Sequence, residues 1–451
     1  MMSGIEPMRA EIEAIVGGGS VVSDDAVCRT LSADGCVPKS VVYPRTAEQV
    51  AAVLKCAADH TLAVIPCRNA TKLGLGNIPA RYDVALSLRK MNNVWHYEPE
   101  DLTATVEAGM KLGELARLLG RNGLWLPLDP PGGARASVGG VLATNASGPL
   151  RLLYGAPRDM IVGMTIATTD GKIIKAGGRV VKNVAGYDLT KLLIGSHGAL
   201  GVMVEAHLKL FPLPAGRATF IFHVASLDEA RDLRKRILQS PLNPMRMTLL
   251  NAEAGKVVWE DEAGARPGST MTLWVEAGGT NRVLERYART LGAIGSAAGA
   301  KVSTMEQGTA ERSWARMVDF QSWLAEEFSD AVILRGSLPI AGCEEFVNRA
   351  QQGADKTKSR LAVFAQPGVG TAHLCYLDPS DYSAIVSTID NLRAAAKELH
   401  GALLVERCAP EIKQRLDVWG APGNDFEVMR KVKHAWDPKG ILSPGRFVGR
   451  L

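Results

Sequence analysis

Small residues dominate the stretch DPPGGARASVGGVLATNASGP, from Asp129 to Pro149, and they limit what the surrounding chain can fold into. The stretch contains five glycines, four alanines, two serines and one threonine. Glycine lets a backbone approach a large ligand closely and present its N–H groups, and phosphates bind well to such a surface. A glycine-rich loop that only turns a corner is the alternative. The spacing matches neither G-x-G-x-x-G nor G-x-x-x-x-G-K-[ST], so we expect neither a Rossmann nor a P-loop nucleotide site.

The overall composition excludes several classes of protein. With 451 residues, the chain is long enough for two domains. Hydrophobic residues make up 46% and charged residues 22% of it, which is typical of a soluble globular protein. Its net charge of +5 comes from scattered basic residues, which argues against a nucleic-acid-binding protein. No apolar run is long enough to span a membrane, so any membrane contact would go through a partner.

The cysteines are spread over the length of the chain. They include no C-x-x-C pair and no tight cluster, so we expect neither an iron–sulfur cluster nor a structural zinc site. Scattered thiols and the absence of a secretory signal predict a cytoplasmic protein, which would reach the inner membrane only through partners. The seven residues are Cys28, Cys36, Cys56, Cys67, Cys343, Cys375 and Cys408.

The first half of the chain alternates short strands with helices. Residues 46–60 predict a helix with Thr46 as its N-cap, and residues 161–178 predict a hairpin that turns at Asp170-Gly171. Beyond residue 216, strands and helices alternate in a second pattern, which predicts an antiparallel sheet with helices on one face. Further strands are predicted at residues 40–44, 62–67, 83–88 and 103–109, and a further helix at 111–123.

A long string in the middle of the chain and a short one near its end carry a family resemblance. The first is the glycine stretch followed by YGAPRDMIVGMTIATTDGKIIKAGGRVVKNVAGYDLTKLLIGSHGALGVMVEAHLKLFPLP, and the second is DPKGILSPGRF. Both closely resemble the FAD domain of the vanillyl-alcohol oxidase superfamily and, within it, the smaller FAD-binding subunit of bacterial glycolate oxidase. The resemblance runs from about Ser40 to Pro214 and resumes in the tail.

The resemblance implies an α+β fold in two main parts. A PCMH-type FAD-binding domain with two subdomains would grip FAD, and an α+β cap domain with an antiparallel sheet would cover the flavin ring. The chain then divides into an N-terminal extension (1–37), the FAD-binding domain (38–215), the cap (216–405) and a C-terminal segment that returns to the FAD-binding domain (406–451).

The same resemblance implies which residues lie along the diphosphate and the flavin. From the glycine stretch they are Pro131, Gly132, Ser137, Gly139, Gly140, Thr144, Asn145 and Gly148. From the second string they are Val184, Gly186, Tyr187, Asp188, Gly198, Leu200, Gly201 and Val202. Taken alone, Tyr187 and Asp188 would normally be interpreted as a packed ring and a helix cap.

The sequence departs from the family in the loop after the second strand, PCRNATKLGLGN. This loop usually carries three glycines that touch the diphosphate; here Arg68, Asn69 and Ala70 take their places, while Thr71 fits the pattern. Asn tolerates a left-handed backbone, whereas Arg and Ala tolerate it poorly. Either Arg68 supplies charge to a phosphate, with Asn69 and Thr71 also binding FAD, or the loop binds FAD weakly or not at all. The loop lacks a histidine, so we expect non-covalent FAD.

The cap also departs from its catalytic relatives, which carry a metal site and a general base. In QPGVGTAH, Gln366, Val369 and Thr371 replace family residues, whereas His373 remains. Together with Glu406, His373 would supply only two ligands, which is too few for a metal site, so no metal is expected.

An arginine that binds the substrate carboxylate is retained in LRGSLP as Arg335, although Gly336 replaces the acid that follows it. An arginine fork suits a carboxylate, and His373 is the best remaining base, so these two are the candidate catalytic residues. A histidine packed on a half-buried strand is the alternative for His373. Glu406 and Arg407 fit a surface or interdomain ion pair better than catalysis.

Three functions fit these observations. We predict a FAD-binding subunit of a glycolate or D-lactate dehydrogenase complex, with a paralogous larger FAD subunit and an iron–sulfur subunit as partners. The substrate would be oxidised mostly on the larger subunit, and this chain's flavin would react or relay electrons. An architectural subunit that has lost tight FAD binding is the second possibility. A self-sufficient flavin dehydrogenase for a small 2-hydroxy acid is the third, and it requires His373 or another base to act without metal ligands.

Overall fold

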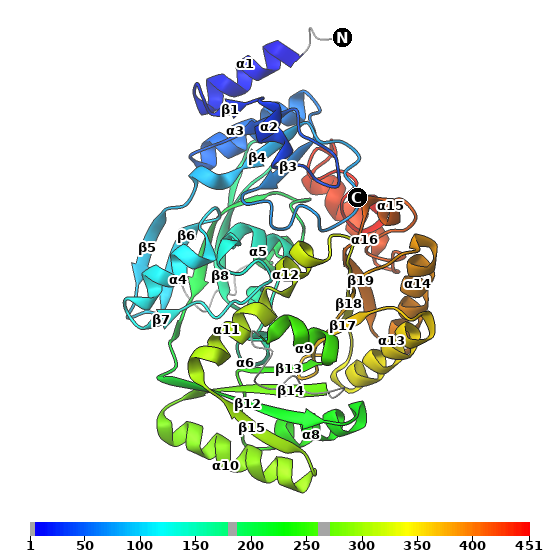
Figure 1. Ribbon diagram of the computed structural model, residues 1–451. Helices are drawn as coiled ribbons and strands as arrows, with labels where there is room; N and C mark the ends of the chain where they lie inside the picture. The colour runs from blue at the N-terminus through cyan, green and yellow to red at the C-terminus, as the bar shows by residue number, and fades with distance from the viewer. Residues whose placement is uncertain (1–4, 179–186, 260–270) are drawn as a thin grey trace.

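The computed structural model describes residues 5–178, 187–259 and 271–451. Figure 1 shows two lobes in the N-terminal part of the chain and a long sheet beyond them. The main sheets of the three parts have four, five and eight strands. Among the described helices, none is long and apolar enough to cross a membrane.

The first lobe is built on a four-stranded sheet in the order β1-β2-β4-β3, in which β1 is antiparallel and the others are parallel. Helix α3 begins as predicted, because the Thr46 hydroxyl accepts a hydrogen bond from the Gln49 N–H at 3.2 Å. Residues 5–37, expected as an extension, add α1, α2 and β1 to this lobe. Its elements are α1 (Ile5–Val16), β1 (Val21–Val22), α2 (Asp25–Arg29), β2 (Ser40–Val42), α3 (Ala47–Asp59), β3 (Val64–Cys67) and β4 (Val84–Ser87).

The second lobe is a five-stranded antiparallel sheet in the order β5-β6-β10-β8-β9. The predicted hairpin is confirmed as β8 and β9. Part of the glycine stretch forms helix α5, whose N-cap Ser137 accepts a hydrogen bond from the Gly140 N–H at 3.3 Å. The elements are β5 (Val94–Glu98), β6 (Thr103–Glu107), α4 (Leu112–Gly120), β7 (Leu124–Trp125), α5 (Val138–Thr144), α6 (Arg151–Tyr154), β8 (Ile161–Ala167), β9 (Ile173–Gly177), α7 (Leu189–Leu193), β10 (Val202–Lys209) and β11 (Phe211–Pro212).

Two glycines of the stretch are required by packing within the chain. A Cβ at Gly148 would lie 1.9 Å from the backbone oxygen of Asp129. A Cβ at Gly139 would lie 2.9 Å from the Cβ of Ala108. Any side chain would push α5 or the turn after it away from these neighbours. The sequence reasoning assigned this small-residue backbone to a ligand, but the protein itself fills part of the space.

The long sheet forms the core of the cap. Its eight strands are all antiparallel, which confirms the α+β class and the antiparallel cap sheet predicted from the sequence. In spatial order they are β15 (Lys301–Met305), β12 (Gly216–Val224), β14 (Met271–Gly279), β13 (Arg246–Leu250), β17 (Leu361–Gln366), β18 (Thr371–Tyr376), β16 (Val332–Ser337) and β19 (Ala402–Arg407).

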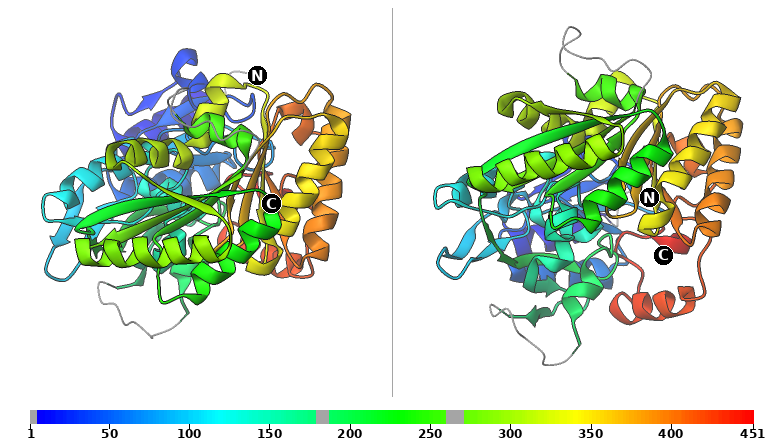
Figure 2. Two further views of the ribbon diagram at one scale, coloured as in Figure 1. Left: turned by 60° about the horizontal axis from the view of Figure 1, so that its bottom comes forward. Right: turned by 90° about the horizontal axis from the view of Figure 1, so that it is seen from below.

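Helices cover both faces of this sheet, so the prediction of helices on one face was wrong (Figure 2). Successive side chains of a strand point to opposite faces, and here both sets are apolar: Phe220 and Phe222 enter one core, and Ile221 enters the other. An apolar face needs a cover on each side. One side carries α8 (Leu227–Gln239), α10 (Asn281–Ala297), α13 (Cys343–Thr357) and α14 (Tyr382–Glu398); the other carries α9 (Ala252–Val258), α11 (Gln307–Val318) and α12 (Phe320–Glu327).

The end of the chain packs against the first lobe. The Val64 N–H donates to the Ile441 carbonyl at 2.8 Å, and the Ser443 N–H donates to the Val64 carbonyl at 2.9 Å, so the tail continues the sheet beside β3. Figure 1 shows this red segment beside the blue strands of the first lobe. Its helices are α15 (Pro410–Lys413) and α16 (Phe426–Trp436).

Candidate functional site

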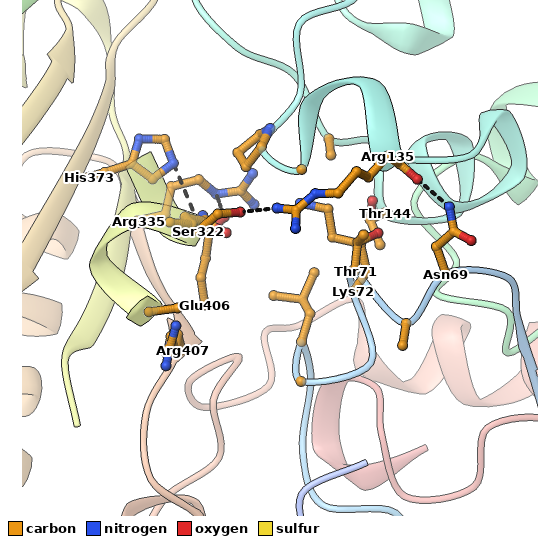
Figure 3. A pocket seen from close by; sticks show the side chains of 18 of the residues that line it. Asn69, Thr71, Lys72, Arg135, Thr144, Ser322, Arg335, His373, Glu406 and Arg407 are labelled. Carbon is orange, nitrogen blue, oxygen red and sulfur yellow. Dashed lines mark hydrogen bonds and ion pairs between the residues drawn. The ribbon is translucent and has the colours of Figure 1, made fainter. Parts of the chain in front are cut away.

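A cavity of about 420 Å³ lies between the first two lobes and the cap (Figure 3). We call it the first cavity. Loop 69–75 and the glycine stretch form one wall, and strands β16, β18 and β19 with helix α12 form the other. The two walls come from opposite parts of the chain, so only the folded protein brings them together.

Three adjacent strands aim side chains into this cavity. Arg335 on β16 is the cross-strand neighbour of His373 on β18 and of Leu404 on β19. All three line the cavity. Gly336 faces the opposite side of the sheet, where a Cβ would lie 2.5 Å from the Phe346 ring. The loss of the family's acid at this position therefore changes the packing of the cap and leaves the cavity wall intact.

A β-bulge brings two consecutive residues to the same wall. Ile333 pairs with Arg407, but the next residue, Leu334, pairs with Val405, so Glu406 is an additional residue in β19. Neighbouring side chains of a regular strand point to opposite faces, whereas a bulge redirects them. Both Glu406 and Arg407 consequently line the first cavity.

Glu406 is the central acid of this wall. Its carboxylate lies 3.3 Å from Arg335 Nε and 3.5 Å from His373 Nε2, and it accepts a hydrogen bond from Gln321 at 2.6 Å. Burial raises the pKa of the Glu406 carboxyl, but the charge of Arg335, together with the neighbouring His373 and Lys72, outweighs burial and holds the pKa below its usual value. Glu406 is thus an ionised, buried carboxylate and not the surface or interdomain ion-pair partner expected from the sequence.

His373 is buried beside this carboxylate, and only 5% of its side chain is exposed. Burial lowers the pKa of the imidazole, and the nearby Arg335 and Lys72 add to this effect against the opposing influence of Glu406. The Phe320 ring of α12 packs against it with the ring centroids 5.1 Å apart. His373 is therefore a neutral histidine that can accept a proton inside the cavity.

The glycine stretch is fastened to the cap through one aspartate. The Gly132 N–H donates to Asp319 Oδ1 at 2.8 Å, and Arg135 lies 3.3 Å from the other carboxylate oxygen. Arg135 also donates to the Ser322 hydroxyl at 2.6 Å. These contacts, drawn in part in Figure 3, set the distance between the two walls.

The altered loop is well braced. Arg68 Nε donates to the Gly109 carbonyl at 3.0 Å, and the Asn69 amide donates to the Arg135 carbonyl at 2.5 Å. Of the three positions that replace glycines, only Ala70 has a left-handed backbone, with φ +59°. The difficulty expected for Arg68 therefore does not arise, because its backbone avoids that region. Its guanidinium ties the loop to the turn that follows β6.

Two further cavities adjoin the first through loop 69–71. The second, of about 100 Å³, runs from this loop to α5 and residues 197–203. The third, of about 800 Å³, is lined by Arg68, Arg89, Lys111 and other residues of the first two lobes. We call the two together the cofactor grooves. Their basic lining suits a diphosphate.

One buried atom in these grooves has an unused hydrogen bond. Arg446 lines the second cavity, and its Nη1 has no hydrogen-bond partner within the described part of the chain, although Nη2 donates to the Leu73 carbonyl at 2.6 Å. A buried donor without a partner is costly, and an anionic group in the groove would satisfy it. The residues present therefore fit the expected FAD.

Most of the residues expected at the cofactor and substrate line these cavities, but several do not. Asp188 caps α7 by accepting a hydrogen bond from the Lys191 N–H, and Tyr187 is 97% exposed; neither lines any of the three cavities. Val184 and Gly186 lie outside the described residues. Asn145, Gly148 and Leu200 line none of the three.

The other expected residues line the first or the second cavity. The first cavity contains Asn69, Thr71, Pro131, Gly132, Thr144, Arg335 and His373, and the second contains Arg68, Asn69, Thr71, Ser137, Gly139, Gly140, Thr144, Gly198, Gly201 and Val202.

Sequence reasoning missed two residues that line both the first and the second cavity, Lys72 and His197. Burial, followed by the charges of Arg446, Arg335 and Lys72, lowers the pKa of His197 to about 3. The His197 ring packs edge-on against Trp419 with the centroids 4.6 Å apart. Lys72 directly follows Thr71, but no motif marked it.

Comparison with known families gives two matches that together span most of the chain. A FAD binding domain matches residues 38–177, and the C-terminal domain of FAD linked oxidases matches residues 213–447. The second match alone covers more than half of the chain.

Individual proteins and solved structures are also similar to this chain over most of its length. Glycolate oxidase subunit GlcD of Bacillus subtilis is 27% identical over 92% of this chain and 90% of its own length. D-lactate dehydrogenase of Archaeoglobus fulgidus is 28% identical over 91% of each chain. A structure of p-cresol methylhydroxylase with bound substrate matches the fold with a TM-score of 0.75 at 17% identity, over 99% of this chain and 97% of that one. These matches confirm the predicted PCMH-type fold and FAD as the cofactor.

Proposed function

The chain belongs to the FAD-linked oxidase family, and we propose that it oxidises a small 2-hydroxy acid such as glycolate or D-lactate. One observation carries the proposal: Arg335, His373 and Glu406 meet in the first cavity, next to the cofactor grooves. A carboxylate-binding group and a neutral base are what this oxidation requires of a protein.

The charges of the first cavity favour an acid as substrate. Lys72, Arg135, Arg335 and Arg407 all line it, whereas Glu406 is its lining carboxylate among the described residues. Such a surplus of positive charge attracts anions and raises their local concentration. Of these cations, Arg335 lies beside the proposed base and is the one we assign to the substrate carboxylate.

Each of these residues has its own role in the proposed reaction. The Arg335 guanidinium holds the carboxylate and thereby orients the hydroxyl carbon. His373 accepts the hydroxyl proton, and the Glu406 carboxylate 3.5 Å away stabilises the imidazolium that forms. When bound, FAD supplies the acceptor for the hydride that leaves C2 with both electrons of the C–H bond. Helix α12 covers these side chains with Gln321 and Phe320 and limits access of water.

We further propose that the electrons leave through partners, a paralogous larger FAD subunit and an iron–sulfur subunit, in the cytoplasm or at the inner membrane. The chain's seven cysteines are free, four in the first lobe and three in the cap or just after its last strand, and they include no C-x-x-C pair, which argues against a cluster of its own. The relative from Bacillus subtilis is itself named as a subunit of an oxidase.

The visible absorption spectrum of the purified chain tests the proposal, recorded without oxygen before and after adding glycolate or D-lactate. A flavin band that bleaches is the expected result and makes the chain a dehydrogenase by itself. A band that persists alone but bleaches with the larger subunit present makes it a FAD subunit that needs its partner. A chain that remains colourless after soaking in FAD is architectural, and the proposal is then wrong.

A further inference from the structure

Lys72 lies where the first and second cavities meet, and its ammonium group has no partner among the described residues. The side chain lines both cavities, beside Thr71 and on the opposite side from Glu406 (Figure 3). Among the residues that the structure describes, none forms a hydrogen bond or an ion pair with its Nζ. The reaction proposed above gives this lysine no role.

Burial makes this unpaired charge costly. Burial lowers the pKa of the Lys72 ammonium, and the carboxylates of Glu406 and Asp319 offset this effect only in part. Arg335 already lies 3.3 Å from Glu406. Arg135 lies 3.3 Å from Asp319, so neither carboxylate is left to pair with the lysine. A buried ammonium in this state favours binding of an anion beside it.

The backbone around Lys72 is held in place by the tail of the chain. Arg446 Nη2 donates to the Leu73 carbonyl at 2.6 Å, and Lys413 Nζ donates to the Gly74 carbonyl at 2.6 Å. Both donors are buried cations. The backbone from which the Lys72 side chain extends is therefore held in place before negative charge develops next to it.

The position of Lys72 indicates which anionic group lies next to its ammonium. The second cavity contains residues expected at the diphosphate, and the first contains Arg335 and His373. A hydride passes only between groups in contact, so the reacting flavin ring has to lie where the two cavities meet. Lys72 is therefore next to the ring, while Arg335 serves the substrate carboxylate.

We propose that Lys72 stabilises the negative charge that the flavin ring acquires on two-electron reduction and thereby raises the reduction potential of the cofactor. This inference rests on the function proposed above. The two electrons and one hydrogen come from the C2–H bond of the hydroxy acid, and the hydroxyl proton goes to His373. The charge added to the ring thus remains beside Lys72.

Sulfite binding and redox titration test this role without a hydroxy acid. Sulfite adds to oxidised flavin and leaves a negative charge on the ring, so a nearby cation strengthens its binding. We would titrate the full-length chain, saturated with FAD, as wild type and as Lys72→Met, Lys72→Gln and Lys72→Arg. The matched control is Lys172→Met, which removes the same charge from an exposed turn where Lys172 pairs with Asp170.

The expected result is sulfite affinity at least tenfold weaker in Lys72→Met and Lys72→Gln, with the potential lower by about 30 mV for each tenfold loss. Lys72→Arg and Lys172→Met should keep wild-type values. Unchanged affinity and potential in the Met and Gln variants would overturn the inference. Loss of FAD from both, with Lys72→Arg still loaded, would also overturn it, because Lys72 would then serve cofactor affinity.

The two proposals fail in different ways. If Lys72→Met raises the KM for the hydroxy acid while the potential stays unchanged, Lys72 binds substrate, and only the inference is wrong. If sulfite affinity depends on Lys72 but no hydroxy acid bleaches the wild-type flavin, the proposed substrate is wrong and the charge effect stands. A chain that holds no FAD contradicts both.

Discussion

The two walls of the first cavity are built by different means. The wall formed by the first two lobes, the first wall, consists largely of small residues and backbone together with Lys72 and Arg135, and cations from the distant tail hold it in place. The second wall, on the cap, consists of polar side chains from three neighbouring strands of one sheet: the charged Arg335 and Glu406 and the neutral His373. The first wall thus depends on long-range contacts for its shape, and the second depends on strand register for its chemistry. Changes in the two walls should therefore have different consequences.

Lys413→Met should have the largest effect, and it should break the first wall. The Lys413 ammonium lies 2.8 Å and 2.9 Å from the two Asp34 oxygens and also binds the Gly74 and Gly76 carbonyls, with 1% of its side chain exposed. The variant leaves the Asp34 carboxylate buried and unpaired, which costs about 3–5 kcal/mol. A lower melting temperature together with lost FAD is the expected measurement. Lys431→Met, at an exposed position, is the control, and equal melting temperatures would refute the prediction.

His373→Asn should damage the second wall without harming the first. Loss of a positioned base lowers kcat by about 10²–10⁴-fold. FAD content and melting temperature should stay close to wild type, because His373 lies on the cap and away from the cofactor grooves. Single-turnover reduction of the flavin measures the effect. A variant with wild-type reduction rates would show that another group takes the proton.

The pH dependence of kcat/KM should report the same histidine. His373 must be neutral to act as a base, and burial lowers its pKa, so activity should fall only below the ordinary histidine value of about 6.5. The Glu406 carboxylate opposes this effect by raising the pKa of His373. Glu406→Gln should therefore move the acid limb of the profile to lower pH. A shift to higher pH would contradict the proposed pairing.

Arg335→Met should weaken substrate binding, with a smaller loss of activity than His373→Asn causes. Losing the charged hydrogen bonds to a carboxylate costs about 1.5–3 kcal/mol, so kcat/KM should fall by about 10- to 100-fold. Arg335→Lys keeps the charge but loses the planar fork and should recover only part of the activity. Arg349→Met, on a partly exposed cap helix where Arg349 pairs with Glu345, is the control. Equal losses in the control would contradict a specific role.

Ala70→Gly should have the smallest effect and should strengthen the first wall. Ala70 has φ +59°, where glycine is favoured over alanine by about 1 kcal/mol. The melting temperature should rise slightly and FAD should bind at least as tightly. Arg68→Gly should act in the opposite direction, because it removes the hydrogen bond to the Gly109 carbonyl. FAD affinity measured for both variants decides whether the loop is braced as the structure indicates.

Local patterns were enough to predict much of the fold. The Thr46 cap of α3 and the β8–β9 hairpin depend on residues within a few positions of each other, and both appear as predicted. The second set of cap helices was missed because both faces of the strands are apolar, and a period of two does not show which face is covered.

The site was predictable only in part, because a local sequence pattern does not record how distant segments pair and pack. Arg335 and His373 were found because they stand in motifs of fixed spacing. The bulge at Glu406 was not found, because it is a difference in pairing between two strands and no single strand records it. Tyr187 and Asp188 stand in an equally specific motif, yet neither lines a cavity, since the motif alone does not state which way the side chains point.

By itself, the sequence determined the family, the cofactor and two of the groups proposed for the chemistry. These properties are carried by short strings whose residue types and spacing do not depend on the rest of the chain. Only the tertiary structure decided that the altered loop is braced, that Glu406 is buried between Arg335 and His373, and that Lys72 has no partner in the part of the chain that the structure describes. Burial and the electrostatic field at a side chain are summed over all its neighbours in space, and those neighbours come from every part of the chain.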